Sequence, residues 1–172
     1  FVAVGGCCST GRIWTSPDSV SWTERTSLGS WADHLLGITY GNGLFVTVGA
    51  WAGNALATST DGVNWTRRTS GTSKILRGVT YGSGHFITVG DSGTILSSPD
   101  GTNWTTRASG TSNGLIGVTY GNGQFIAVGS SGTILTLTTS SPTPPSPTPT
   151  VKPSPAGTPT PTPTPTPAKK AV

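Results

Sequence analysis

Few side chains in this sequence could perform acid–base chemistry: its 172 residues include six acidic residues and two histidines. Three of the acids, Asp18, Asp61 and Asp100, occupy equivalent places in the recurring turns S-P-D-S, S-T-D-G and S-P-D-G. A carboxylate in such a turn typically accepts hydrogen bonds from nearby backbone N–H groups. A glycoside hydrolase of the two-carboxylate type needs an acid on either side of the scissile bond, and no spacing pattern pairs Asp33 with Asp91. We therefore expect no catalytic residue and no cofactor.

The arginines and histidines do not form a known catalytic pattern either. Arg25, Arg68 and Arg107 each follow a recurring tryptophan by three residues. Equivalent positions of a repeat lie in equivalent environments on separate units, which predicts packing against each tryptophan and not convergence on one substrate. His34 and His85 are not accompanied by the G-x-S-x-G motif of a serine nucleophile. We expect both histidines to be loop residues.

Residues that depart from the repeat are the better candidates for ligand binding, because the needs of the scaffold do not explain them. Trp31, Asp33 and His34 lie where other copies have Ser-Gly-Thr-Ser, Trp51 lies in an insertion, and Trp14 replaces an aliphatic residue. Exposed aromatic rings offer flat apolar faces on which sugar rings stack. The alternative is that these side chains cover gaps between repeat units or form a subunit contact.

One phrase recurs through the sequence and defines its repeat. It reads FVAVG, FVTVG, FITVG and FIAVG and begins at Phe1, Phe45, Phe86 and Phe125, with spacings of 44, 41 and 39 residues. A tyrosine in G-[IV]-T-Y-G precedes it, and a tryptophan in W-T-x-R follows it. Large apolar residues alternate with small ones at period two, as half-buried strands require. Gly-Asn-Gly and Gly-Ser-Gly between two such runs indicate hairpin turns.

Each unit thus reads as four short strands, and units of this size predict an all-β protein, a β-propeller of four-stranded blades. The expected blades cover residues 1–27, 35–70, 75–109 and 115–138. The first begins at its second strand and the last ends at its third, which gives 14 strands, or about 3.5 blades. Open sheet edges expose unpaired backbone groups. The sequence is therefore expected to be either a fragment of a longer propeller or a subunit whose blades other chains complete.

The phrase S-x-D-G-x-x-W, present at residues 59–65 and 98–104, resembles the Asp-box of sialidase-like (BNR-like) β-propellers, although it is one residue shorter. The resemblance covers residues 1–138. It implies a propeller architecture and a structural turn, not catalysis. That superfamily includes sialidases, xyloglucan-cleaving glycoside hydrolases, photosystem assembly factors and many cell-surface proteins. The arginine triad and the tyrosine–glutamate pair of a sialidase cannot be assembled from these repeat positions.

Charge and cysteine content exclude several classes. The net charge of +4 arises largely from Lys152, Lys169 and Lys170 near the C-terminus, whereas a nucleic-acid-binding domain concentrates basic residues on its folded part. No apolar run reaches the roughly 20 residues of a membrane span. Cys7 and Cys8 are either reduced thiols, a disulfide between neighbours, or links to other chains. No metal-ligand spacing accompanies them.

Residues 139–172 form a separate Pro/Thr-rich tail or linker. Alternating proline and threonine favours extended polyproline II geometry, and Thr-Pro repeats are frequent targets of O-glycosylation. Such tails resemble the linkers of secreted modular bacterial carbohydrate-active proteins. The expected O-glycosylation sites are Thr143, Thr148, Thr150, Thr158, Thr160, Thr162, Thr164 and Thr166.

The sequence therefore predicts a non-catalytic extracellular or cell-surface scaffold or recognition propeller displayed on a glycosylatable stalk. Its expected partners are glycans or cell-surface proteins, with neither nucleic acid nor a membrane span. Two alternatives stay open. One is a structural subunit of an extracellular filament that assembles through its open blade edges, and the other is a fragment of a glycoside hydrolase.

Overall fold

The computed structural model describes residues 1–6, 11–25, 34–50 and 55–138. The chain splits into two units, Phe1–Thr139 and Ser140–Val172. Several expectations fall outside the described residues: those for Trp31, Asp33, Trp51, Cys7, Cys8 and all the threonines of the tail. Within the described ranges, no helix is long and apolar enough to cross a membrane.

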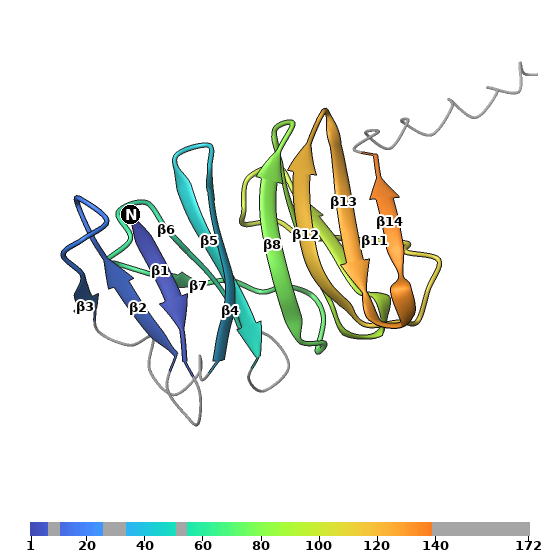
Figure 1. Ribbon diagram of the computed structural model, residues 1–172, viewed down its shortest axis with the longest axis horizontal. Helices are drawn as coiled ribbons and strands as arrows, with labels where there is room; N and C mark the ends of the chain where they lie inside the picture. The colour runs from blue at the N-terminus through green and yellow to red at the C-terminus, as the bar shows by residue number, and fades with distance from the viewer. Residues whose placement is uncertain (7–10, 26–33, 51–54, 139–172) are drawn as a thin grey trace, which may run out of the picture. The chain divides into compact units, whose positions relative to one another are not determined.

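Fourteen strands occupy the described part of the chain and form four antiparallel sheets (Figure 1). The first sheet contains β1 (Val2–Gly5), β2 (Arg12–Thr15) and β3 (Thr23–Arg25). The second contains β4 (His34–Gly41), β5 (Leu44–Ala50), β6 (Ala55–Ser59) and β7 (Thr66–Arg67). The third contains β8 (Leu76–Gly82), β9 (His85–Gly90), β10 (Ile95–Ser98) and β11 (Thr105–Arg107). The fourth contains β12 (Leu115–Gly121), β13 (Gln124–Gly129) and β14 (Ile134–Leu137).

Each sheet is a blade whose strands pair in chain order, so the predicted β-propeller architecture is confirmed. The first strands of the three later blades, β4, β8 and β12, contact one another in succession and are the inner strands. In the described residues, the first blade has no inner strand and the fourth has no outer strand. Within the described ranges, the predicted count of strands and the partial first and last blades are therefore also found.

Two-residue turns set the register of each inner hairpin. The turn residues Asn42 and Gly43 both have positive φ, at 49° and 74°. This left-handed pair matches the twist of the flanking strands and favours Asn-Gly. The register places Tyr40 opposite Phe45, and their ring centroids lie 4.5 Å apart. The other two hairpins repeat this tyrosine–phenylalanine pair, with centroids 4.6 and 4.7 Å apart.

Glycine at the end of each inner strand lets the next blade approach. A Cβ added to Gly41 would lie 2.1 Å from Cγ of Tyr81, and one added to Gly82 would lie 2.1 Å from Cγ of Tyr120. The tyrosine ring of one blade therefore lies directly on the glycine of the blade before it. At the equivalent Gly121, no atom lies within 4 Å of the added Cβ. Tyr40, which has no described inner strand before it, is 58% exposed.

The apolar core lies largely between blades and not within them. One cluster joins residues of the second blade, such as Val46 and Leu56, to Leu76 and Phe86 of the third. Trp104, which directly precedes the third blade's outer strand, packs against this cluster. A second cluster joins the first and second blades, and Trp65 packs against it in the same way. A third joins the third and fourth blades.

We expect the substitution Gly82→Ala to destabilise the protein, because the new methyl group would displace the ring of Tyr120. Overpacking of this kind costs about 1–3 kcal/mol. Urea denaturation would measure the loss in the free energy of unfolding.

The matched control is Gly121→Ala, at the same position of the fourth blade, where the added Cβ meets no atom within 4 Å. Its effect should stay within about 0.5 kcal/mol. Equal losses in the two variants would show that the tyrosine–glycine contact does not hold the third and fourth blades together.

Candidate functional site

The recurring acids lie in one kind of turn, which we call the aspartate turn: residues 16–22, 59–65 and 98–104. In the second blade, Asp61 Oδ1 accepts hydrogen bonds from the backbone N–H groups of Val63 and Asn64, at 2.8 and 2.7 Å. Its Oδ2 accepts a bond of 2.8 Å from Nδ2 of Asn64. The Ser59 hydroxyl donates to Asp61 Oδ1 over 2.9 Å. The third blade repeats these contacts around Asp100.

These hydrogen bonds stabilise the charged form of each carboxylate. The backbone N–H of Asn64 is the largest cause that lowers the pKa of Asp61 far below its usual range. The backbone N–H of Asn103 does the same for the pKa of Asp100, and in the first blade the backbone N–H of Ser21 lowers the pKa of Asp18. A carboxylate with so low a pKa is a poor proton donor or acceptor near neutral pH.

The aspartate turn also orients the tryptophan that ends it. The indole N–H of Trp65 donates to the carbonyl of Gly62 over 3.1 Å, and Trp104 donates to Gly101 over 3.0 Å. Both glycines adopt positive φ, at 73° and 70°. The turn therefore fixes the ring that packs against the preceding blade.

The repeated arginines bind hydroxyl groups on the neighbouring strand. Each donates from Nε to a threonine or serine ten residues earlier: Arg25 to Thr15 (2.6 Å), Arg68 to Thr58 (2.9 Å) and Arg107 to Ser97 (2.8 Å). Their partner is thus a hydroxyl, where the sequence predicted the tryptophan. The reason is strand geometry, because two residues three positions apart on an extended strand point to opposite faces of the sheet.

The other described acids are paired as well. Asp91, one of the two acids outside the recurring turns that a hydrolase could have used, accepts a hydrogen bond from Nε of Arg77 in an ion pair. Glu24 forms an ion pair with Arg12, with an N–O distance of 2.9 Å. Five of the six acidic residues of the chain lie in the described ranges, and all five have hydrogen-bond donors. No group of three or more metal-ligating side chains occurs among the described residues.

Two of the predicted ligand-binding residues, Trp14 and His34, lie in the described part of the chain. Trp14 is half-buried on β2, opposite Ala3 and Glu24. His34 is the half-buried first residue of β4, opposite Ala50. His34 and His85 are thus the first residues of strands β4 and β9 and not the loop residues that we expected. Trp14 and His34 belong to different sheets.

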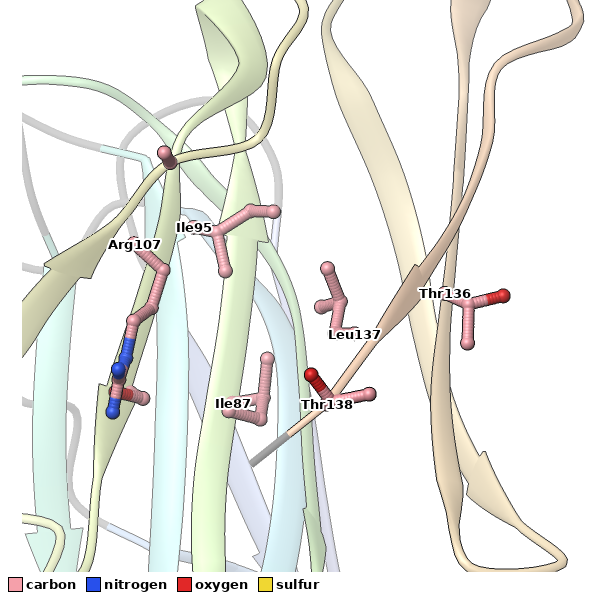
Figure 2. Close-up of a pocket in the computed structure, with 8 residues that line it drawn as sticks. Ile87, Ile95, Arg107, Thr136, Leu137 and Thr138 are labelled. Carbon is pink, nitrogen blue, oxygen red and sulfur yellow. The ribbon is translucent and has the colours of Figure 1, made fainter. Parts of the chain in front are cut away.

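A cavity of about 230 Å³ lies between the third blade and β14 (Figure 2). The third blade contributes strand residues and β14 contributes its C-terminal end. The lining residues are Ile87, Ile95, Ser97, Arg107, Ala108, Thr136, Leu137 and Thr138. This surface was not predicted from the sequence. The signal that could have found it is Leu137-Thr138, which stands where the other blades have the Ser-Pro or Ser-Thr of an aspartate turn.

We expect acid to remove the contribution of the aspartate turns to stability. Because folding lowers the pKa of Asp61 and Asp100 from the ordinary value of 3.8, their contribution is fully present above that value and is lost as the pH falls toward the folded pKa. The double variant Asp61→Asn/Asp100→Asn should have a lower Tm than the unmodified chain at pH 7. Thermal unfolding followed by circular dichroism, from pH 7 to pH 2, measures the Tm of the unmodified chain and of the double variant.

The gap in Tm between the two proteins should narrow once the pH falls below about 4. A gap of constant size across this range would mean that the two charges do not stabilise the turns.

Comparison with known proteins agrees with this architecture. The model of the DUF6242 beta propeller domain matches residues 16–162. A solved structure, "YCF48 bound to D1 peptide", is similar with a TM-score of 0.62 and 18% sequence identity, over 80% of this chain and 46% of that chain. This chain spans less than half of that neighbour, and at this identity the likeness shows the fold alone. No curated protein matches the chain. By its family match and its blades, the chain belongs to the DUF6242 beta propeller domain family.

Proposed function

We propose that this propeller is a non-catalytic recognition and scaffold module that acts outside the cell or at its surface. Its partners are cell-surface proteins or glycans. The Pro/Thr-rich residues 139–172 serve as an O-glycosylated spacer, like the linkers of secreted modular bacterial carbohydrate-active proteins.

Binding is favoured over catalysis because the described acidic side chains already form hydrogen bonds within turns or ion pairs with arginines. A glycoside hydrolase needs one carboxylic acid that is protonated and one carboxylate that is free to attack or to activate water. Here the turns lower the pKa of Asp18, Asp61 and Asp100, and Asp91 is paired with Arg77. The aspartate turn is best understood as a form of the Asp-box of sialidase-like propellers, in which the turn is structural.

A polypeptide partner is consistent with the structural neighbour, which is bound to a peptide. A glycan partner is suggested by aromatic residues that depart from the repeat, of which Trp14 is described. Its ring lies near the end of β1, where a Cβ on Gly5 would be 3.7 Å from Cζ3 of the indole. Half-buried indoles of this kind provide an apolar face for a sugar ring or an apolar side chain.

The length of the Pro/Thr-rich tail sets how far the propeller would stand from the surface that carries it. Twelve of the chain's fourteen prolines lie between Pro142 and Pro167. A polyproline II segment rises about 3.1 Å per residue, so this stretch would extend on the order of 80 Å. A spacer of that length would hold the propeller away from the surface that carries it.

The test is binding of the full chain to a glycan array and to a panel of extended peptides, followed by titration of the best binder with two variants. Trp14→Ala should weaken binding by about tenfold, as expected for a residue at the centre of a binding site. His34→Ala, in the next sheet, should have the same effect only where the ligand spans both blades. Trp22→Ala is the matched control, because Trp22 lies in the same blade, occupies a repeat position shared with Trp65 and Trp104, and is not a candidate contact.

Variants are first compared with the unmodified chain by circular dichroism, so that unfolding is not mistaken for lost contact. Absence of binding to any glycan or peptide would count against recognition. Hydrolysis of a glycan substrate that Asp91→Asn abolishes would show that the protein is an enzyme.

A further inference from the structure

The cavity beside β14 lies at a defined place in the repeat, on the side of a blade where an outer strand is expected. In the first three blades the outer strand pairs with the strand that directly precedes it in the chain, as β11 pairs with β10. In the fourth blade, β14 is the last strand, and no described strand pairs with its second edge. The cavity opens next to this edge (Figure 2).

The walls of the cavity match the surface that holds a tryptophan in other blades. Trp104 packs against a cluster that includes Val46 and Leu56 of the blade before it. In the repeat, Val46 corresponds to Ile87 and Leu56 to Ile95. Ile87 and Ile95 line the cavity. The cavity therefore occupies the place that an aspartate-turn tryptophan of the fourth blade would fill.

The third blade also has the surface against which the glycine of a following aspartate turn would pack. A Cβ added to Gly101 would lie 3.3 Å from Cγ2 of Val46, and one added to Gly62 would lie 2.6 Å from Cγ2 of Val2. The aspartate turn thus packs closely against the second strand of the preceding blade. Ile87 is the residue of the third blade that corresponds to Val46 and Val2.

The fourth blade also carries the acceptor of the polar contact that recurs in the other blades. Thr136 corresponds to the three hydroxyl residues that accept hydrogen bonds from Arg25, Arg68 and Arg107. The described residues include no outer-strand arginine in the fourth blade. Figure 2 shows the hydroxyl of Thr136 directed away from Ile87. An outer strand paired with β14 would thus place a tryptophan in the cavity and an arginine, three residues later, at Thr136.

We infer that the second edge of β14, which no described strand pairs with, and this cavity form a docking site for one further outer strand with the pattern S-x-D-G-x-x-W-T-x-R. The strand binds by β-augmentation, in which backbone hydrogen bonds give affinity and side-chain pockets give specificity. The cavity of about 230 Å³ is smaller than the roughly 300–1,000 Å³ of small-molecule pockets and suits a single large side chain.

The docking strand comes from a polypeptide outside residues 1–172. Residues 139–172 contain neither tryptophan nor arginine, so they cannot supply this pattern. The three W-x-x-R segments of the chain already lead into β3, β7 and β11, which pair within their own blades.

The experiment uses the full chain and a fluorescein-labelled peptide with the sequence of residues 98–109, SPDGTNWTTRAS. Fluorescence anisotropy should show saturable binding with one peptide per chain. Peptides that carry Trp104→Ala or Arg107→Gln should bind at least about tenfold more weakly.

Two variants of the chain locate the site. Thr136→Val removes only the hydroxyl acceptor and should lower the affinity for the unmodified peptide by about fivefold. The same variant should leave the affinity for the Arg107→Gln peptide unchanged. Thr119→Val makes the same change at another exposed threonine of this sheet, on β12, and should have no effect.

Absence of saturable binding would overturn the inference, and so would binding that is insensitive to the tryptophan and arginine of the peptide. Sedimentation of the chain alone tests whether a second copy of the chain occupies the site. Concentration-dependent association that the peptide reverses would show that a second copy, and not a separate strand, covers β14.

Discussion

The structure depends on the way each blade packs against the one before it. Two aromatic contacts make this junction. A tyrosine from the inner strand lies on a glycine of the preceding blade, as Tyr81 lies on Gly41. A tryptophan from the aspartate turn packs against the preceding blade's apolar strands, as Trp104 does. Because the core is shared between neighbours, no blade of this size buries its apolar faces alone, as is general for repeat proteins.

The charged side chains have a different role from the aromatic residues at these junctions. The described carboxylates stabilise turns or pair with arginines, and the repeated arginines hold the outer strands to hydroxyl groups. The aspartate turn also fixes the tryptophan that packs against the preceding blade, since the indole N–H of Trp65 donates to a carbonyl of the turn itself. Charged groups therefore act on local geometry, and the apolar and aromatic groups act between blades.

The strands, turns and blade boundaries could be predicted from the sequence because their causes are local. Asn42-Gly43 determines its hairpin through positive φ, and alternation determines which residues of a strand face one side. The partner of Arg68 could not be read in this way, since it depends on which face of the blade the side chain occupies. The cavity at Ile87 was also missed, because it arises from what is absent beside β14 in the described residues and not from a motif. Of the predicted ligand-binding residues, only Trp14 and His34 fall within the described structure.

The tryptophan of the aspartate turn stabilises the fold by packing against the preceding blade. Trp22 and Trp104 allow a direct comparison, because both indoles donate to a carbonyl of their own turn. Only Trp104 has a described blade before it, and Trp22 is 44% exposed. The measurement is the free energy of unfolding of Trp104→Ala and Trp22→Ala in urea. We predict a loss of about 2–4 kcal/mol for Trp104→Ala and of about 1 kcal/mol or less for Trp22→Ala. Equal losses would show that packing of the tryptophan against the preceding blade does not stabilise the fold.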